Sequence, residues 1–600
     1  MATVSAIPKK KIAGGSFLLE ERAPEEVFTP EDLTEEHRQI ARTTEEFAKN
    51  EIVPVSDRIE HKDFALVREL LKKASELGLV SADVPEQYGG MEMDKVSSAV
   101  IADNIAKDGS FSVAFGAHTG IGVLPIVYFG TEQQKQKYLP KLASSEWVGA
   151  YALSESSSAS DAMNPRTKAV LSPDGKHYIL NGEKMWITNA NFADVFIVFA
   201  KVDGEKFTAF IVDRTSPGFS VGAEEHKMGI RGSSTCPLIL NDCHVPVENV
   251  LGEIGKGHII AFNILNIGRF KLGAMSVGGA RVSLQNAIAY SKQRKAFGKT
   301  ISEFGMIREK LAQMAAKIYA SESMVYRTVG MMDVALAEVD KGSADATKEI
   351  RRAIEEYAVE CSIIKVAGSE MLDFVVDETV QVYGGYGFVE EYPAERAYRD
   401  SRVNRIFEGT NEINRMIITG WLLKRALTGQ LPLLPAIQKV MDELMAGPSA
   451  GEILDGPLAT ERAMVANMKK VAMVCAGAAS QKYMQALADQ QEIMGALADM
   501  IIETYAAESC IIRAMKVAQN SGEAAAANVT ALAQIYLMSA MEEVESAARK
   551  VVAAVADGDM MRTQMMMLRR LLKYDPVNVI GLQQQIAQKL LETGKYGPVQ

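Results

Sequence analysis

The chain has 600 residues, of which 48% are hydrophobic and 24% charged, and its formal net charge is −11. This length predicts about three to five domains or subdomains. The composition excludes a disordered or collagen-like chain, and the acidic balance argues against nucleic acid as a partner. Five cysteines without regular spacing make no disulfide framework and fit a reducing compartment.

Residues 1–29 are predicted to be an extended, solvated N-terminal segment. A small basic cluster, Lys9–Lys11, is not followed by an apolar signal core, and acidic residues begin at Glu20. This pattern argues against a secretory signal and, less strongly, against a transit peptide. No run of about 18 apolar residues occurs, so we expect no transmembrane helix.

The next two domains differ in their periodicity. Residues 30–150 have helical spacing, and Thr29–Asp32 is typical of a helix start with Pro at its first position. Residues 151–254 predict a small antiparallel β-domain, because segments rich in β-branched and aromatic residues alternate with turn dipeptides. The segments are His177–Leu180, Val195–Val202 and Phe207–Val212, and the dipeptides are Asp174-Gly175, Asn181-Gly182 and Asp203-Gly204.

Long helices return in residues 255–428, with periodic segments at Ile259–Asn286, Ile307–Val339 and Ala344–Val382. Residues 429–457 contain several Pro and Gly and are predicted to be a linker. Residues 458–600 form a further helical block rich in Ala and Met, for which core packing is favoured over a partner or membrane surface. The order α, β, α does not alternate, which disfavours a doubly wound parallel sheet.

Several common motifs are absent from the sequence. It contains no Rossmann or P-loop glycine motif, no H-E-x-x-H or C-x-x-C metal pair and no G-x-S-x-G elbow. The neighbours Cys243 and His244 lack a second ligand pair, so we predict no metal site. A nucleotide cofactor would have to be held without a Rossmann turn.

Four segments could carry chemistry. Tyr151–Asp161 is a Ser-rich polar cradle, and Gly182–Asn189 places Trp186 beside Thr188, where a planar ring could stack. The glycines of Gln381–Phe388 would allow close approach of a ligand. In Arg405–Glu412, burial of Glu408 against Ile406 and Phe407 would raise its pKa and suit a general base. Taken singly, each segment also fits a plain loop, a core Trp or a helix end.

Together, the order and spacing of these segments resemble the acyl-CoA dehydrogenase family over about residues 35–428. Three further segments, Phe115–Gly122, Lys227–Ile230 and Ile264–Phe270, are similar to its very-long-chain branch. That branch has an additional C-terminal helical domain, as the block after residue 430 would be. The resemblance implies a multidomain α+β fold: an N-terminal α-helical domain, a middle antiparallel β-domain, a C-terminal four-helix bundle and an additional all-α C-terminal domain.

The resemblance also implies an activity. Enzymes of this family remove two hydrogens from an acyl-CoA thioester, here a long-chain fatty acyl-CoA, and give a trans-2-enoyl-CoA. Glu408 would take the α-proton, and the β-hydrogen would leave as hydride to N5 of FAD. A flavin ribityl hydroxyl and the N–H of Glu408 would stabilise the thioester carbonyl oxygen. Electrons would pass to electron-transfer flavoprotein.

The family's site residues carry over to this sequence by position. Trp186 would pack on the isoalloxazine ring, Thr188 would bond it near N5, and Gln381–Gly385 would bind the adenine end of FAD on a neighbouring subunit. The implied FAD contacts are Tyr151, Leu153, Ser154, Ser160, Trp186, Ile187, Thr188, Arg294, Phe297, Gln381, Gly384, Gly385, Thr410, Asn411 and Glu412. The implied substrate contacts are Ser160, Asn266, Arg269, Phe407 and Gly409. Ser156, Ala159 and Ala296 depart from the family pattern of Pro, Gly and Gln, which puts details of the FAD contacts in doubt.

Other expectations concern partners and alternatives. We expect a homodimer, with a tetramer as the alternative, and a bacterial-type cytoplasmic location. Residues 430–600 could instead make peripheral contact with the inner membrane face. Gly116, Gly120 and Gly122 are expected either to leave room for a long acyl chain or to permit close helix packing. The competing functions are an acyl-CoA oxidase, which would produce hydrogen peroxide, and a scaffold or assembly protein on a dehydrogenase fold.

Overall fold

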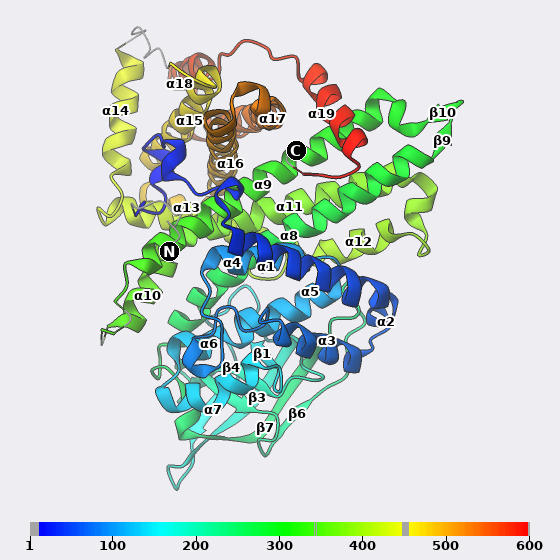
Figure 1. The fold of residues 1–600 in the computed structure, drawn as a ribbon. Helices are drawn as coiled ribbons and strands as arrows, with labels where there is room; N and C mark the ends of the chain where they lie inside the picture. Colours follow the sequence, from blue (N-terminus) through cyan, green and yellow to red (C-terminus); the bar gives the residue numbers. More distant parts are fainter. Residues whose placement is uncertain (1–10, 341, 344, 447–454, 598–600) are drawn as a thin grey trace.

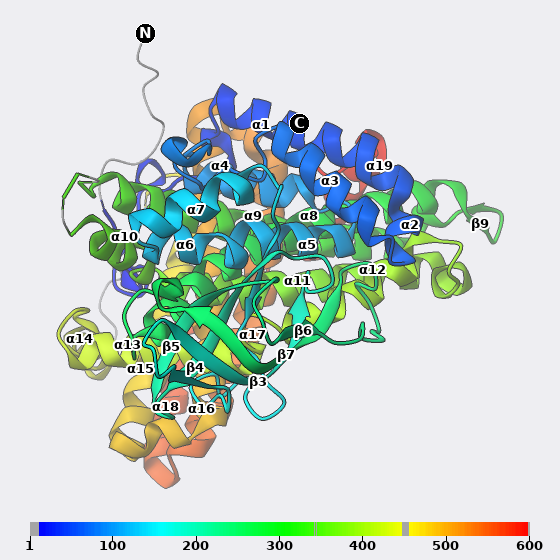
Figure 2. The same ribbon diagram turned by 90° about the horizontal axis from the view of Figure 1, so that it is seen from below.

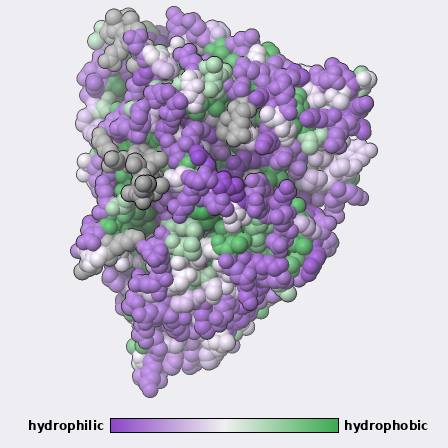
Figure 3. Space-filling model, viewed as in Figure 1, coloured by the Kyte–Doolittle hydropathy of each residue, from purple (hydrophilic) through white to green (hydrophobic). Residues whose placement is uncertain are grey.

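The computed structural model describes residues 11–340, 342–343, 345–446 and 455–597. Figure 1 shows a β-domain below, a central layer of long helices, and a further helical domain above it. The turned view in Figure 2 shows the N-terminal helices beside the sheet and the bundle. On the face in Figure 3, hydrophilic side chains predominate and hydrophobic ones gather in smaller patches across the middle.

The N-terminal segment is packed where it is described, and the prediction of an extended, solvated segment is wrong for residues 11–29. It forms short 3-10 turns at Ser16–Leu18 and Pro24–Glu26, and its hydrophobic side chains are buried. The Phe17 ring lies 4.7 Å from that of Tyr505 in the C-terminal domain. Burial of this apolar surface outweighs the conformational entropy of a free end. Lys9 and Lys10 lie outside the described residues.

Seven α-helices make the N-terminal domain. The predicted helix start at Pro30 gives only a 3-10 turn, and the first α-helix begins after Thr34. Thr34 is the N-cap, because its hydroxyl accepts a hydrogen bond from the first-turn N–H of His37 at 3.3 Å. The helices are α1 (Glu35–Phe47), α2 (Ser56–Glu60), α3 (Phe64–Glu76), α4 (Lys95–Ile105), α5 (Gly109–Gly116), α6 (Leu124–Phe129) and α7 (Glu132–Ala143). A π-helical turn, Ala117–Gly122, joins α5 to α6.

An eight-stranded sheet forms the middle domain, in the order β6-β7-β3-β2-β4-β5-β8, with β1 beside β4. Most pairings are antiparallel, but β1 and β2 run parallel to β4. The strands are β1 (Gly149–Ala152), β2 (Lys168–Leu171), β3 (His177–Thr188), β4 (Val195–Val202), β5 (Lys206–Asp213), β6 (Phe219–Val221), β7 (Thr235–Pro246) and β8 (Val250–Leu251).

One predicted turn is wrong. Asn181-Gly182 lies inside β3, which continues to Thr188, as an irregularity in its pairing with β7. The Asn181 side chain donates to Asp242 Oδ1 at 3.0 Å and accepts from Asp242 N at 2.8 Å. These bonds satisfy the backbone of a bulge, a role that Asn-Gly fills as readily as a hairpin turn.

Long helices pack against both other domains. The predicted helix 344–382 is two helices in the structure, α10 and α11, because the helix is interrupted at Glu356–Tyr357. At this interruption the buried Tyr357 hydroxyl donates to Ile12 O at 2.8 Å. The helices are α8 (Gly257–Gln293), α9 (Gly305–Ala337), α10 (Ala346–Glu355), α11 (Ala358–Tyr383), α12 (Pro393–Ser401) and α13 (Asn411–Leu427). A short hairpin, β9 (Lys295–Ala296) and β10 (Lys299–Thr300), projects from one end (Figures 1 and 2).

The additional C-terminal domain is entirely helical where it is described. The predicted linker 429–457 contains helix α14, because Leu433 and Val440, seven positions apart, are buried against the fold; its residues 447–454 lie outside the described part. The helices are α14 (Leu433–Met445), α15 (Ala459–Tyr483), α16 (Gln491–Ser521), α17 (Glu523–Val555), α18 (Gly558–Leu571) and α19 (Val579–Thr593). Helix α16 packs against α9 and α13 of the central layer.

Two helical segments in the described chain pass a length and composition test for crossing a membrane, Gly109–Phe129 and Glu523–Val555. In the fold, 83% and 61% of their most apolar windows are buried. Packed core helices pass the same test.

Candidate active site

The turn Glu408-Gly409 precedes helix α13 and is held in an uncommon conformation. Both residues have positive φ, +57° and +79°, a region that costs free energy for a residue with a side chain. Three side chains hold the carbonyls of this turn. Arg269 Nε donates to Glu408 O at 3.3 Å, and Asn414 Nδ2 and Lys365 Nζ donate to Gly409 O at 2.9 and 2.7 Å. The direction of the Glu408 side chain is therefore fixed from three helices.

The Glu408 carboxyl group is enclosed and poorly solvated. Its Oε2 atom is buried and has no hydrogen-bond partner in the part of the chain that the structure describes. A Cβ atom at position 268 of α8 would lie 2.7 Å from that oxygen, so only glycine leaves room for it. Burial raises the pKa of Glu408 to about 7, against the opposing positive charges of Arg269 and Lys365.

The cause of this pKa shift differs from the predicted one. Ile406 was expected to bury Glu408, but its side chain is 52% exposed. Phe407 does line the same cavity as Glu408. Another enclosing group is Tyr151, whose pKa is raised well above its ordinary value by burial and by the nearby Glu408 carboxylate. Because Tyr151 precedes Arg405–Glu412 by more than 250 positions and comes from the sheet, no local pattern could indicate its contact.

The Ser-rich segment is positioned by a buried ion pair. Lys184 Nζ on β3 lies 2.7 Å from Glu155 Oε1 and also donates to Leu153 O at 3.2 Å. Ser154 O accepts from Met185 N at 2.9 Å, which brings this segment beside Trp186. Tyr151, Leu153 and Ser154 therefore lie next to the predicted Trp186–Thr188 segment, whereas Ser160 lies exposed farther along the loop.

The end of β3 presents an aromatic face and a hydroxyl. Trp186 has a φ of +58° at a second bulge, and its side chain is 54% exposed. Ile187 points into the core, and Thr188 lines the cavity that contains Glu408. A half-exposed Trp is costly in a monomer and suits stacking on a planar ring.

The remaining residues around the turn have separate places. Thr410 is the N-cap of α13 and accepts from Ile413 N at 3.3 Å, while the side chain of Glu412 is exposed. Asn411 is buried and bound to Lys365 and Ser369. Asn266 accepts from Arg269 Nη1 at 3.0 Å and so holds the guanidinium in place.

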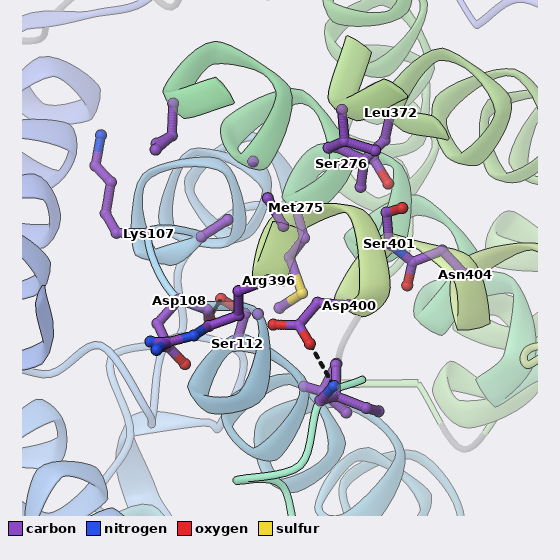
Figure 4. A pocket seen from close by; sticks show the side chains of 18 of the residues that line it. Lys107, Asp108, Ser112, Met275, Ser276, Leu372, Arg396, Asp400, Ser401 and Asn404 are labelled. Carbon is purple, nitrogen blue, oxygen red and sulfur yellow. Dashed lines mark hydrogen bonds between the residues drawn. The ribbon is translucent and has the colours of Figure 1, made fainter. Parts of the chain in front are cut away.

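A cavity of about 640 Å³ extends from Glu408 along α8. Its α8 wall runs from Gly268 to Asn286, a helical length of about 27 Å. Figure 4 shows part of its lining, with Met275 and Leu372 near the polar side chains of Asp400 and Ser401 on α12 and of Asn404 in the 3-10 turn that follows α12. Of the three glycines considered above, Gly116 lines the cavity, Gly120 does not, and Gly122 packs closely on the Gly149 backbone.

A second group of predicted residues lies far from Glu408. Arg294, Phe297, Gln381, Gly384 and Gly385 gather at the other ends of α8 and α11, near the β9–β10 hairpin. Arg294 lies over the Tyr386 ring at 5.4 Å, and Phe297 is 95% exposed. Arg269 and Arg294 are separated by about 37 Å of helix. One chain thus does not bring these two groups together.

Lys365 and Asn414 were missed in the sequence. Lys365 stands in an apolar helical run, and its burial lowers its pKa to about 7. A charged residue amid apolar helix positions was the available signal for Lys365. Asn414 follows the turn at a spacing that suits bonds back to its carbonyls. Among the described residues, no group of three or more His, Cys, Asp or Glu side chains could hold a metal ion.

Comparison with protein-family models gives four matches, all described as acyl-CoA dehydrogenase domains. The N-terminal domain model matches residues 34–146, the middle domain model matches 150–243, and two C-terminal domain models match 255–423 and 467–570.

Individual relatives agree with these matches. A probable acyl-CoA dehydrogenase of Bacillus subtilis is 49% identical, over 97% of this chain and 98% of its own. The very long-chain specific acyl-CoA dehydrogenase of Macaca fascicularis is 40% identical, over 65% of this chain and 58% of its own. A crystal structure of an acyl-CoA dehydrogenase complexed with FAD from Bacillus anthracis has a TM-score of 0.96 and 50% identity, covering 98% of this chain and 100% of its own.

Proposed function

We propose that this chain, which belongs to the acyl-CoA dehydrogenase family, oxidises long-chain acyl-CoA thioesters to trans-2-enoyl-CoA with Glu408 as the base. Its family makes it an FAD-dependent oxidoreductase. The observation that carries the proposal is the Glu408 carboxyl group, enclosed at the head of a long cavity and raised in pKa to about 7.

The residues beside Glu408 fit a flavin ring. Trp186 offers an exposed aromatic face, Thr188 a hydroxyl, and the buried Tyr151 hydroxyl has no hydrogen-bond partner among the described residues. FAD, when bound, supplies the hydride acceptor of the reaction. We propose Tyr151, Leu153, Ser154, Trp186, Ile187 and Thr188 as the contacts with the flavin end.

The chain's own part in the chemistry is to position the substrate and to remove its α-proton. Glu408 takes the α-proton of the thioester onto Oε1 or Oε2, and its raised pKa brings its basicity close to what operation near neutral pH requires. The burial around Tyr151 and Gly268 keeps water from the carboxylate, so its electrostatic interactions are stronger than in solution. Arg269 and Asn414 hold the backbone from which the side chain projects.

The length of the cavity supports a long-chain substrate. Its α8 wall of about 27 Å would accommodate about 22 methylene groups in extended form, at about 1.2 Å for each C–C bond. Asn266, Arg269, Phe407 and Gly409 are proposed to contact the thioester end, with Ser160 farther out on its loop.

The distant group at the β9–β10 hairpin supports a second subunit. We propose that Arg294, Phe297, Gln381, Gly384 and Gly385 of a neighbouring copy bind the adenosine end of FAD, since the exposed Phe297 and the open space above Gly384 and Gly385 would suit a ligand there. We propose residues 30–150, 151–254, 255–428 and 458–600 as the folding units. We propose electron-transfer flavoprotein as the electron acceptor, and a cytoplasmic location like that expected of bacterial relatives.

The first test is a titration of the purified, FAD-loaded protein with palmitoyl-CoA under anaerobic conditions. We expect the visible flavin band to bleach at about one equivalent of thioester per active site, because the reductive half-reaction needs no second acceptor. Bleaching by butyryl-CoA but not by palmitoyl-CoA would contradict the long-chain assignment alone. A flavin band unchanged by any straight-chain thioester would contradict the proposed function.

The pH dependence gives an independent prediction. Only deprotonated Glu408 accepts a proton, and its pKa is raised to about 7 in the free protein. We therefore expect kcat/KM to rise with pH and to level off above about 7, rather than near the ordinary glutamate value of 4.5. Stopped-flow flavin reduction between pH 5 and 9 measures this, and a rate already constant at pH 5.5 would contradict the raised pKa.

A further inference from the structure

A continuous series of hydrogen bonds connects the turn Glu408-Gly409 to the additional C-terminal domain. We call this turn the catalytic turn, after the proposed role of Glu408. Lys365 Nζ donates to Gly409 O at 2.7 Å and to Asn411 Oδ1 at 2.6 Å. The amide nitrogen of Asn411 donates in turn to Glu370 Oε1 at 2.9 Å and to Ser369 Oγ at 3.1 Å.

The series then crosses into helix α16. Arg415, one turn after Asn411 on α13, binds both oxygens of Glu370, at 2.9 and 3.0 Å. Its remaining Nε–H donates to Asp499 Oδ1 at 2.7 Å. Asp499 belongs to α16 of the C-terminal domain, so a residue of that domain lies five contacts from the Gly409 carbonyl, next to Glu408.

Each contact in this series restricts the next. Asp499 fixes the plane of the Arg415 guanidinium, whose two terminal nitrogens then hold Glu370 in one orientation. Glu370 and Ser369 bind the Asn411 amide nitrogen, which leaves the amide oxygen facing the Lys365 ammonium. An Asn411 side chain rotated by half a turn would put its NH2 group against that ammonium group. Lys365 is buried, so losing an acceptor would cost it much more than an exposed lysine would lose.

From this geometry we infer that Asp499 is a positioning residue, through which the C-terminal domain holds the catalytic turn in its reactive conformation. The inference rests on the proposed role of Glu408. The positive φ values of the turn are maintained by contacts from other helices. Among these contacts, the hydrogen bond from Lys365 to Gly409 O is the one that the series links to α16. Small displacements of a catalytic group reduce the rate steeply while leaving binding of the substrate nearly intact.

The test compares Asp499→Ala with a matched control in the holoenzyme. The control is Glu21→Ala, which removes the ion pair between Glu21 and Arg462 of α15. That pair is also 2.7 Å long, and it also joins the C-terminal domain to the rest of the chain. The exposed fractions are 20% and 45% for Arg415 and Asp499, and 20% and 50% for Arg462 and Glu21. The two variants thus remove equally exposed interdomain ion pairs, but only one leads to the catalytic turn.

We expect Asp499→Ala to lower kcat for flavin reduction about threefold to tenfold, with KM for palmitoyl-CoA unchanged. Asp499→Glu should recover most of the rate, because a longer carboxylate still reaches Arg415. Glu21→Ala should keep kcat within about 1.5-fold, although its melting temperature should fall as much as that of Asp499→Ala.

Equal kcat values in Asp499→Ala and Glu21→Ala would overturn the inference, as would a loss that Asp499→Glu does not recover. Glu408→Gln in the same assay separates this failure from failure of the proposed function. If Glu408→Gln is inactive and Asp499→Ala is fully active, only the positioning role is wrong. If Glu408→Gln remains active, the proposed base is wrong and the inference with it.

Discussion

Glu408→Gln is expected to bind FAD and acyl-CoA and yet to reduce its flavin at least about 10³-fold more slowly than the unchanged protein. Glutamine keeps the shape of the side chain but has no basic oxygen to accept the α-proton. Among the other groups at the turn, Arg269 is a cation and Tyr151 has a pKa raised well above its ordinary value, while Lys365 Nζ is held on Gly409 O and Asn411 Oδ1. Stopped-flow absorbance after mixing with palmitoyl-CoA measures the loss, and the unreduced flavin spectrum confirms that the cofactor is bound.

Glu360→Gln is the matched control for this prediction. Glu360 is a buried glutamate of the central helices that resembles Glu408 in two respects: one of its oxygens lacks a partner among the described residues, and burial raises its pKa to about 7. Its other oxygen accepts from Gly15 N at 2.6 Å, and it does not line the cavity. We expect this variant to keep its flavin-reduction rate within about twofold. A flavin-reduction rate of Glu408→Gln within tenfold of the parent would contradict the role of Glu408 as the base. An equally large loss of rate in Glu360→Gln would mean that the effect comes from altering a buried glutamate and not from proton transfer.

The catalytic turn and the strand-end Trp could be predicted from the sequence because their signals are local. A Glu before Gly-Thr-Asn and a Trp two residues before Thr are visible within eight residues, and the order of α, β and α domains follows from periodicity. The structure and the family matches confirm that order and the additional helical domain.

The contacts that hold the Glu408-Gly409 turn are not local, and so they were missed. Lys365 precedes Gly409 by 44 positions, and Asp499 follows Arg415 by 84. Helix α14 and the buried N-terminal segment depended on surfaces elsewhere in the chain, which outweighed the local Pro, Gly and charge signals. The prediction of a turn at Asn181-Gly182 was wrong for a different reason, since a bulge and a hairpin turn favour the same residues.

Gly279→Leu is expected to convert a long-chain pocket into one for medium chains. Gly279 lines the cavity on α8, and a Cβ atom there would meet only Leu372 Cδ1, at 3.6 Å. It lies about 16 Å along the helix from Gly268, which corresponds to about 13 bonds of an extended acyl chain. A leucine side chain would therefore occupy the space of the carbons beyond that point. We expect kcat/KM for palmitoyl-CoA to fall at least about tenfold and that for octanoyl-CoA to stay within twofold.

Gly279→Ala distinguishes a blocked pocket from a disturbed helix. A methyl group makes ordinary contact with Leu372 and leaves the cavity open, and alanine stabilises a helix interior by about 1 kcal/mol relative to glycine. This variant should therefore retain palmitoyl-CoA turnover and melt no lower than the parent. A loss of octanoyl-CoA turnover in Gly279→Leu would mean that α8 had moved Gly268 and Arg269 at the catalytic turn. Unchanged palmitoyl-CoA turnover in Gly279→Leu would instead mean that the acyl chain does not follow α8, and the long-chain proposal would lose its structural support.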